Sequence, residues 1–396
     1  MDRSLEELYT ALSVASSFPL SVSPTHEDLD CLLSRLLPLC RKARITRLGD
    51  LTGLDRIGLP VVQAIRPGAL SEVTALGRGL SVVEAAVGAI MEALERFFSE
   101  IIPPDRIFLA SAAELGIPRG LFENLARPSC QGEWREVRIP WILALDVASG
   151  STQPVPLELV HTCYTEPPPA GDGIFLRTTT GLACHVSAPA AFLHCLFECI
   201  ERDAMARAFA THGFFDRMRI RSSTSFGGKV ERLLDLARDN GLSLAFWYVP
   251  SPTEVPVVWC QTIETGPGEP TLALPTEGHA AGATLEAAAF GALLEALVTR
   301  AAAISGTRDD QTRRHYRSGS DALVAQARQL ISADVAPIDA ATVESSSSAN
   351  LGSFVRRVAA SGLGPVLAVP VGSDSESGVH CIRTILPAAQ PFAAVR

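Results

Sequence analysis

The chain has 396 residues, of which 47% are hydrophobic and 19% charged, with a formal net charge of −9 and a pI near 5.5. This hydrophobic content excludes an intrinsically disordered chain and allows a large core. The acidic balance argues against a general nucleic-acid-binding protein, because contact with phosphates requires a basic surface. The length corresponds to one large domain or two medium ones.

The beginning of the chain indicates a cytoplasmic protein. Residues 1–12 carry four charged side chains and lack the apolar stretch of a secretory signal. No uncharged apolar run is long and uniform enough to span a bilayer, so no membrane segment is expected. The nine cysteines are scattered and contain no Cys-x-x-Cys pair, which predicts reduced, buried thiols.

Two helices are predicted first, over residues 5–16 and 26–44. Pro38 lies inside the second and is expected to kink or break it. The second helix has a face of leucines, which is expected to pack on the body of the protein. The alternative is that this face binds a partner or a second copy of the chain.

Short strands and one long helix are predicted next. The helix is expected over residues 82–101, since Pro103 and Pro104 would stop it. Residues 165–173 hold three prolines and two glycines and are expected to form a loop that could act as a boundary or a lid. Strands or extended segments are predicted at residues 57–64, 72–76, 107–109, 136–143, 154–159, 161–164 and 175–179.

A helix that ends near residue 211 carries the central acidic motif. Residues 178–197 contain no Asp, Glu, Lys or Arg; Glu198 and Glu201 then follow on one apolar helix face, with Arg202 beside them. Like charges on such a face repel and are poorly solvated, so a cation is expected nearby. Arg202 could compensate them alone, and the second possibility is a divalent metal ion.

The same pattern returns in two other predicted helices. Glu92 and Glu95, followed by Arg96, repeat the Glu-x-x-Glu-Arg spacing, and Glu295 with Arg300 forms a weaker copy. Two copies at identical spacing in apolar helices favour an acidic site to which several helices contribute.

In each of these two other helices, a glycine stands four residues before the first glutamate of the motif. These are Gly88 before Glu92 and Gly291 before Glu295. Because a glycine inside a helix costs about 1 kcal/mol relative to alanine, both positions predict a close approach by a backbone or a ligand.

The second half of the chain holds the third of these helices, predicted over residues 285–305. A glycine-rich turn at residues 278–283 is expected to open it, and His279 there could bind a ligand or be structural. Residues 345–348 are expected to form an exposed loop. Further helices are predicted at residues 229–240 and 354–360, and strands at 242–249, 255–262, 271–274, 366–371 and 379–386.

Four possible zinc ligands lie close together in the sequence: His185, His194, Cys195 and Cys199. Their spacing is not that of known zinc sites, so no zinc site is predicted. Cys199 falls on a core-facing helix surface, which argues against a role as a nucleophile.

These motifs and several other segments resemble the YcaO-domain family, and most of all its subgroup found beside TfuA proteins in peptide-modifying gene clusters. The resemblance covers the chain from about residue 45 to 390. It is carried by Leu51–Val61 with Arg66 and Pro67, Gly77–Glu95, Thr180–Ala183 with His194–Asp203, Ala296 with Arg300–Asp310, and Arg383 with Pro387.

We therefore predict an α+β fold of the YcaO type. Antiparallel-rich sheets would be covered by long helices, with two partly similar halves around a central cleft. Residues 76–396 are expected to form the YcaO-like domain, and residues 1–75 an N-terminal helical and extended region packed on it.

The resemblance implies that ATP and Mg²⁺ bind in a pocket lined by the glutamates. The expected metal ligands are Glu92, Glu95, Glu198 and Glu201. Other residues implied for cofactor binding are Arg78, Arg202, Glu295, Arg300 and Arg308. In this family ATP activates a peptide amide oxygen by phosphorylation, and a Cys, Ser or Thr side chain or external sulfide then attacks the amide carbon. The products are azolines or thioamides.

The chain departs from the family pattern at several expected contact positions. Arg78 stands where lysine is usual, Gly88 where serine is usual, and Thr180 where asparagine is usual; His185-Val186 replaces a Gly-Asn pair and Ala190 a carboxylate. An arginine at Gly291 and a glutamine near Val298 are also absent. Two other hypotheses therefore stay open: a degenerate YcaO protein that binds a peptide or partner as a scaffold without ATP turnover, and an ATP-dependent enzyme acting on another amide.

The partners implied are a ribosomally made precursor peptide and a TfuA-like or second YcaO protein, with a homodimer as a further possibility. The tail lacks the Pro-x-Pro-x-Pro ending of azoline-forming YcaO proteins, which favours a thioamide-type or other subgroup. The resemblance does not assign a catalytic side chain.

Overall fold

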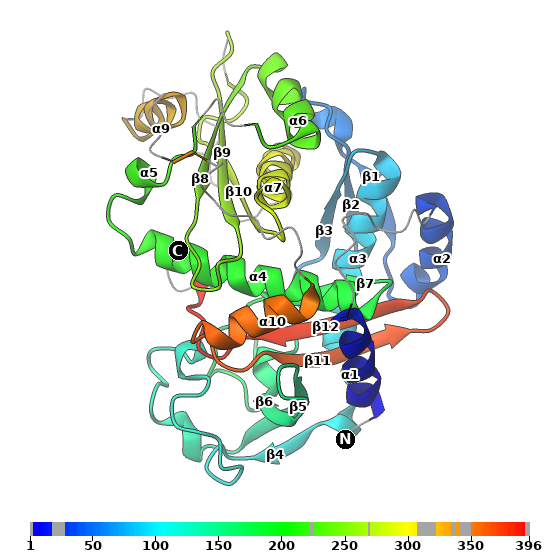
Figure 1. Cartoon of the computed structure of the whole chain (residues 1–396). Coiled ribbons are helices and arrows are strands. Elements are labelled where there is room, and N and C mark those ends of the chain that lie inside the picture. Colours follow the sequence, from blue (N-terminus) through cyan, green and yellow to red (C-terminus); the bar gives the residue numbers. More distant parts are fainter. Residues whose placement is uncertain are drawn as a thin grey trace.

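The computed structural model describes residues 3–17, 28–221, 225–267, 270–306, 322–333, 338–339 and 350–392. Within these residues, three sheets and a set of long helices make up the fold (Figure 1). Every pairing between the named strands is antiparallel.

Two of the sheets have three strands and the third has six. The first contains β1 (Arg47–Asp50), β2 (Val61–Ile65) and β3 (Thr74–Arg78) in that order. The second has the order β10 (Thr276–Ala281), β9 (Val257–Glu264) and β8 (Leu242–Tyr248). The third runs β4 (Phe108–Ala110), β5 (Ile139–Asp146), β11 (Leu367–Asp374), β12 (Val379–Ile385), β7 (Leu182–His185), with β6 (Thr152–Pro156) also paired to β5.

Three long helices connect these sheets. α3 (Val82–Glu100) packs on β2 and β3, and α7 (Leu285–Ser305) packs on β9 and β10. α4 (Ala188–Phe209) crosses the middle of the molecule and touches β7, β10 and β12 (Figure 1). The other α-helices in the described ranges are α1 (Arg3–Ala15), α2 (Leu29–Lys42), α5 (Phe214–Arg217), α6 (Gly228–Asp239), α9 (Ala322–Ser332) and α10 (Leu351–Ala360).

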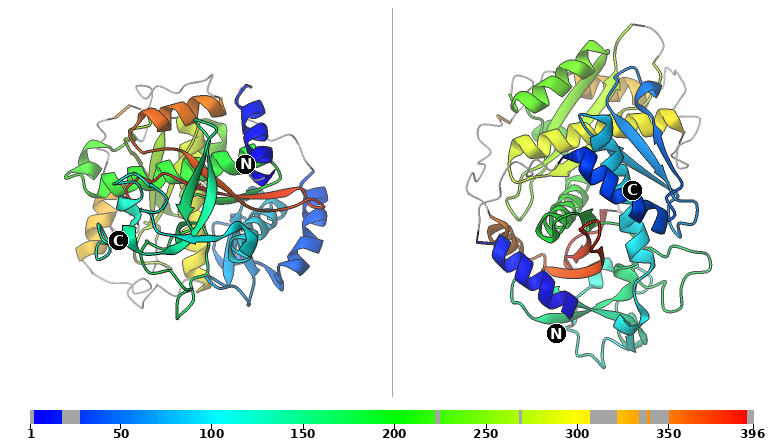
Figure 2. Two further views of the ribbon diagram at one scale, coloured as in Figure 1. Left: turned by 90° about the horizontal axis from the view of Figure 1, so that it is seen from below. Right: turned by 90° about the vertical axis from the view of Figure 1, so that its right-hand side faces the viewer.

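The N-terminal helices lie against these layers. α1 packs on α4, α10 and β11, beside the β11–β12 pair (Figure 2). α2 contacts α3 through a leucine face of which Leu32, Leu36 and Leu39 are buried. The predicted boundary between residues 1–75 and 76–396 falls within β3 and stays a prediction.

The two halves of the fold repeat one strand-on-helix contact. A Cβ atom added at Gly77 of β3 would overlap Ala85 O and Ala89 N of α3, and one added at Gly278 of β10 would overlap backbone atoms of α7. Glycine is therefore required where each strand crosses its helix. Within the helices, a Cβ at Gly88 would lie 3.4 Å from Gly77 Cα, and one at Gly291 2.7 Å from Ala280 Cβ. The neighbour of Gly88 is thus the backbone of β3 at ordinary contact distance, whereas the close approach at Gly291 is made by the side-chain Cβ of Ala280.

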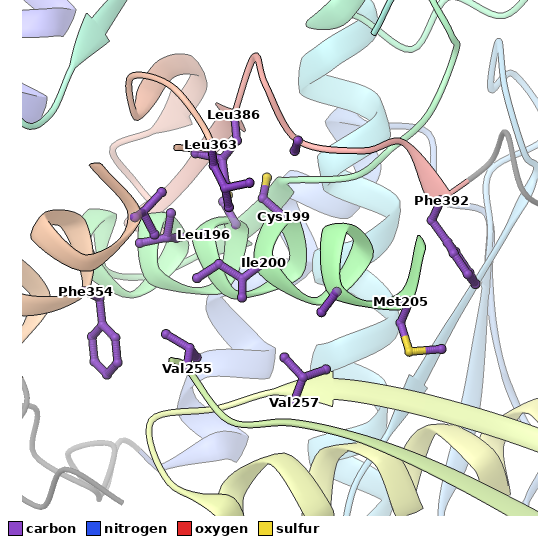
Figure 3. Packing of buried hydrophobic residues seen from close by; sticks show 14 of the residues in the cluster. Leu196, Cys199, Ile200, Met205, Val255, Val257, Phe354, Leu363, Leu386 and Phe392 are labelled. Carbon is purple, nitrogen blue, oxygen red and sulfur yellow. The ribbon is translucent and has the colours of Figure 1, made fainter. Parts of the chain in front are cut away.

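α4 is the centre of the largest described apolar cluster. Leu196, Ile200 and Met205 are fully buried on it, and Ile200 faces Val255 and Val257, the latter at the start of β9 (Figure 3). Its cysteines bind the opposite sheet: Cys195 Sγ donates to Ile382 O at 3.2 Å and Cys199 Sγ to Thr384 O at 3.4 Å. Burial raises the pKa of both thiols, so they are inert packing groups.

The predicted fold class is confirmed, including the helices at residues 82–101 and 285–305, which the structure gives as Val82–Glu100 and Leu285–Ser305. Pro38 does not end α2, because the carbonyl that loses its partner belongs to the solvent-exposed Ser34. The strand at residues 182–185 was not predicted, and the turn predicted at residues 278–283 is wrong, since Thr276–Ala281 is β10. The loop expected at residues 345–348 lies outside the described residues.

Two predicted strands, residues 175–179 and 271–274, are not strands. Glu158 accepts hydrogen bonds from the N–H groups of Gly173, Ile174 and Phe175 at 2.7–3.0 Å. Glu264 likewise accepts from Thr271 and Leu272 at 3.1 and 3.0 Å. Carboxylates thus replace the neighbouring strand that these backbone groups would otherwise need.

Among the described helices, α7 has the length and apolar composition that crossing a membrane requires. Two thirds of its most apolar stretch is buried inside the protein, where it packs on β9 and β10 as a core helix.

Candidate functional site

Five glutamates from three helices meet where α3, α4 and α7 approach one another: Glu92, Glu95, Glu198, Glu201 and Glu295. We call this set the glutamate cluster. Burial, together with the charges of Glu92 and Glu198, raises the pKa of Glu95 well above its ordinary value. Burial and the charges of Glu295 and Glu198 do the same for Glu201. Glu95 and Glu201 are therefore both destabilised as anions by neighbouring carboxylates, as the sequence pattern predicted.

Four members of the cluster are held by backbone N–H groups, three in nearby strands and one in the turn before β7. Each uses one oxygen for this contact, which fixes the direction of its carboxylate and leaves the other oxygen for further partners. The contacts are Leu76 N to Glu92 Oε2 at 3.0 Å, Cys184 N to Glu95 Oε1 at 3.1 Å, Gly181 N to Glu198 Oε2 at 2.9 Å and His279 N to Glu295 Oε2 at 2.9 Å.

Two arginines supply positive charge to the cluster. Arg202 Nε lies 3.5 Å from Glu201 Oε1, and Arg202 Nη2 lies 3.7 Å from Glu198 Oε1. Both distances exceed that of a good charge-assisted hydrogen bond, so the pairing is loose. Arg78, at the end of β3, partly offsets the burial that raises the pKa values of Glu92 and Glu201, and it contributes to the lowered pKa of Glu295. Burial opposes the charge of Arg202, but the glutamates outweigh it and raise the pKa of this guanidinium.

The cluster holds more carboxyl groups than these two arginines could neutralise if all five were ionised. Arg96 lies 3.7 Å from Glu92 but forms a closer pair with Glu72. Glu201 is 7% exposed, and its Oε1 accepts no hydrogen bond within the described ranges. A divalent cation would fit here, since carboxylate oxygens are the donors that Mg²⁺ prefers and charge would be balanced. The side chains of Glu92 and Glu198 are 38% and 21% exposed, so an ion can reach them from solvent.

A pH-dependent stability difference is expected between the wild type and Glu201→Gln. A carboxyl group whose pKa is raised on folding holds its proton more tightly in the folded state than in the unfolded chain. Its ionisation therefore costs stability as pH rises from the ordinary value of 4.5 through the raised pKa. Relative to Glu201→Gln, the wild type should lose free energy of unfolding as pH increases. Added Mg²⁺ should reduce that loss.

Chemical denaturation of both proteins across the pH range, with and without Mg²⁺, measures this effect. The variant serves as the reference for all other titrating groups, which are common to both proteins. A stability difference that does not change with pH would contradict a raised pKa for Glu201.

Arg300 lies in a different environment from the cluster. Its Nε and Nη2 donate to Asp55 at 2.8 and 3.1 Å, and its Nη1 donates to Glu264 at 2.6 Å. The residue is 2% exposed, so it forms a buried ion-pair network that ties α7 to β9 and to the segment before β2. The structure does not bring Arg300 to the glutamates, and its predicted cofactor role has no support from these contacts. Arg308 lies outside the described residues.

The zinc ligands considered in the sequence are not brought together. The sulfurs of Cys195 and Cys199 bind carbonyl oxygens of β12, while His185 and His194 are exposed. The structure instead places His279 beside the cluster, with one ring nitrogen and single carboxylate oxygens of Glu201 and Glu295 all within 4.8 Å of one another. The sequence did hold one signal for His279, namely its position. It directly follows Gly278, where β10 crosses α7, just as Arg78 directly follows Gly77, where β3 crosses α3.

The profile of one protein family matches most of the chain. This family is described as YcaO cyclodehydratase, ATP- and Mg²⁺-binding, and the match covers residues 76–390. A protein from Methanothermobacter thermautotrophicus is 30% identical over 360 residues, which is 88% of this chain and 90% of that one. A protein from Rhizobium leguminosarum bv. trifolii, described as lying in the tfuA 3′ region, is 29% identical over 88% of this chain and 84% of its own length.

Solved structures show the same fold. The YcaO protein of Methanopyrus kandleri, bound with AMPPCP and Mg²⁺, superposes with a TM-score of 0.67 at 21% identity, covering 91% of this chain and 89% of that one. A heterocyclase in complex with substrate and cofactor gives a TM-score of 0.70 at 15% identity over 97% of this chain and 56% of that one.

Proposed function

The chain belongs to the YcaO family, and from this premise we propose that it uses ATP and Mg²⁺ to activate a backbone amide of a ribosomally made peptide. The product would be a thioamide or an azoline. The glutamate cluster is the observation that carries this proposal, because its anchored carboxyl oxygens, from five glutamates beside two arginines, suit a divalent cation.

Glu92, Glu95, Glu198 and Glu201 would hold the metal. When bound, Mg-ATP supplies the phosphoryl group that turns the amide oxygen into a good leaving group, with the metal offsetting phosphate charge. The backbone N–H contacts keep the four carboxylates in place before the cofactor arrives, which lowers the cost of ordering them.

The two arginines have a separate task. Arg202 and Arg78 carry fixed positive charge beside the carboxylates and would offset the phosphate charge of a metal-bound nucleotide. Phe392 supports Arg202, since the guanidinium lies over its ring at 5.7 Å. An arginine at position 78 offers a planar fork of donors where a lysine would offer a point charge.

The partners follow from this chemistry. The nucleophile is a Cys, Ser or Thr side chain of the peptide if an azoline forms, and sulfide if a thioamide forms. A relative in a tfuA 3′ region supports a TfuA-like partner that delivers sulfur in the cytoplasm. A homodimer and a second YcaO protein remain further possibilities for assembly.

A peptide- or partner-binding scaffold without ATP turnover is the second candidate. It is favoured by the replaced contact positions at Thr180 and Ala190, and by the engagement of Arg300 with Asp55 and Glu264. An enzyme that activates another kind of amide would share the same metal site.

Transfer of amide oxygen into phosphate tests the proposal directly. A candidate precursor peptide would be labelled with ¹⁸O at its amide oxygens and incubated with the protein, Mg-ATP and sulfide. The proposal predicts that labelled phosphate and ADP are formed, and that the amount of peptide with an altered mass matches the amount of ADP. Peptide binding without ADP or labelled phosphate would overturn it in favour of the scaffold. Labelled phosphate only from a different amide would identify the third function.

A further inference from the structure

We propose that Glu201, His279 and Glu295 form a mixed nitrogen–oxygen metal position that takes Zn²⁺ or another borderline transition ion in preference to Mg²⁺. The three side chains come from α4, β10 and α7, and their possible ligand atoms lie within 4.8 Å of one another. The position shares Glu201 with the proposed Mg²⁺ ligands, but it requires neither nucleotide nor turnover.

The distances are close to those of a metal site. Zn²⁺ binds nitrogen and oxygen at roughly 2.0–2.2 Å, so tetrahedral ligand atoms lie roughly 3.4 Å apart. The ligand atoms of the three side chains lie within 4.8 Å of one another. Side-chain rotations that move each ligand atom by about 1 Å would bring them to the tetrahedral spacing. Three protein ligands would leave a fourth position for water or another ligand.

The surroundings fix two of the ligands. His279 is 4% exposed, and its ring packs against Trp259 and Phe392 with centroid distances of 5.8 and 5.7 Å. The Glu295 carboxylate is turned towards β10 by the 2.9 Å hydrogen bond from His279 N. One strand residue therefore contributes its ring and also orients the second ligand through its backbone.

A third observation comes from Glu201. Its carboxylate is nine-tenths buried, and its Oε1 accepts no hydrogen bond in the described part of the chain, with only the loose Arg202 contact at 3.5 Å. A buried carboxylate oxygen in this condition is stabilised by an ion that binds it directly.

The ligand type decides which ion is preferred. Mg²⁺ demands six oxygen ligands in near-ideal octahedral geometry, and an imidazole nitrogen does not suit it. Imidazole suits Zn²⁺, and affinity for mixed nitrogen and oxygen sites increases along the first-row series towards Cu²⁺ and Zn²⁺. The glutamate cluster thus divides into an all-oxygen part for Mg²⁺ and one histidine-containing position for a borderline ion.

Cobalt is the probe for this position, because Co²⁺ mimics Zn²⁺ and gives visible and paramagnetic signals. The metal-free full chain would be titrated with Co²⁺ in the absence of nucleotide. We expect saturation at one tight ion per chain, with an exchangeable imidazole N–H signal shifted far outside the normal proton NMR range. Zn²⁺ should displace the ion, and a large excess of Mg²⁺ should not.

His279→Phe removes the nitrogen ligand and keeps a ring against Trp259 and Phe392, and it should weaken Co²⁺ binding at least about 100-fold and abolish the shifted signal. Glu295→Gln keeps an oxygen that can accept the hydrogen bond from His279 N, and it should weaken Co²⁺ binding to a similar extent. The same loss in two different variants would not be explained by a folding defect in one of them. His380→Phe replaces an exposed histidine of β12 and should bind like the wild type.

Unchanged Co²⁺ affinity in His279→Phe, or displacement of Co²⁺ by Mg²⁺ at similar concentration, would overturn the inference. Because nucleotide is absent, neither result bears on Mg-ATP binding, so the failure of this proposal is distinguishable from failure of the proposed function.

Discussion

Replacing Glu198 and Glu201 together by glutamine is expected to lower peptide-dependent ATP turnover by about 10³-fold or more, while the protein stays folded. Metal ions contribute several kcal/mol of charge stabilisation to phosphoryl transfer, and each 1.36 kcal/mol corresponds to about tenfold in rate. Glutamine keeps the size of each side chain, and its carbonyl oxygen can still accept the hydrogen bond that Gly181 N gives Glu198. The loss would therefore reflect metal binding rather than disruption of the fold.

ADP release in the presence of peptide measures this effect. The matched control is Glu6→Gln with Glu133→Gln, which removes the same charge at two exposed positions and should leave turnover within about twofold of the wild type, since such surface positions contribute little. Turnover in the Glu198→Gln/Glu201→Gln protein equal to that of the control would show that the cluster is not the metal site.

The largest effect on stability is expected from Arg300→Met. Removing the guanidinium leaves the buried Asp55, whose side chain is 8% exposed, without its cation. Glu264, whose side chain is 3% exposed, keeps only the half-exposed Arg56 as a cationic partner. Removing one partner of a buried ion pair costs about 3–5 kcal/mol of folding free energy, because an uncompensated buried charge remains. Chemical denaturation monitored by circular dichroism gives this value.

Arg238→Met is the matched control for this substitution. Arg238 forms an i,i+3 pair with Asp235 at 3.7 Å, and its side chain is 52% exposed, so solvent screens the interaction. Its loss should cost no more than about 1 kcal/mol. If Arg300→Met is as stable as this control while nucleotide binding is lost, the guanidinium serves the cofactor, as the family resemblance implied, and not the fold.

Sequence patterns predicted the helices of this protein better than its strands. The helix over residues 82–101 has an apolar face, an N-cap at Ser81 and two prolines after it, so every local preference agrees. The strand at residues 182–185 is four residues long and is defined by its pairing with β12, which is nearly 200 positions away. Pairing at such separations leaves no local signal.

The glutamates of the site were predictable because their spacing repeats on apolar helices. The contacts made by other buried charged residues were less predictable. The chain gives no sign that Glu264 would bind Arg300 and also accept hydrogen bonds from a loop, since these contacts link segments far apart in sequence. His279 was assigned to a turn because glycine usually marks one. Gly278 in fact allows a strand to cross a helix, which only the packing of β10 on α7 reveals.

Calorimetric titration of the purified protein with Mg-ATP tests the central claim most directly, with Glu198→Gln/Glu201→Gln and Glu6→Gln/Glu133→Gln measured beside it. The glutamate cluster as metal site predicts saturable, Mg²⁺-dependent binding by the wild type and the control, weakened at least about 100-fold in the cluster variant, or about 2.7 kcal/mol. No binding at millimolar nucleotide, or equal binding by all three proteins, would contradict it.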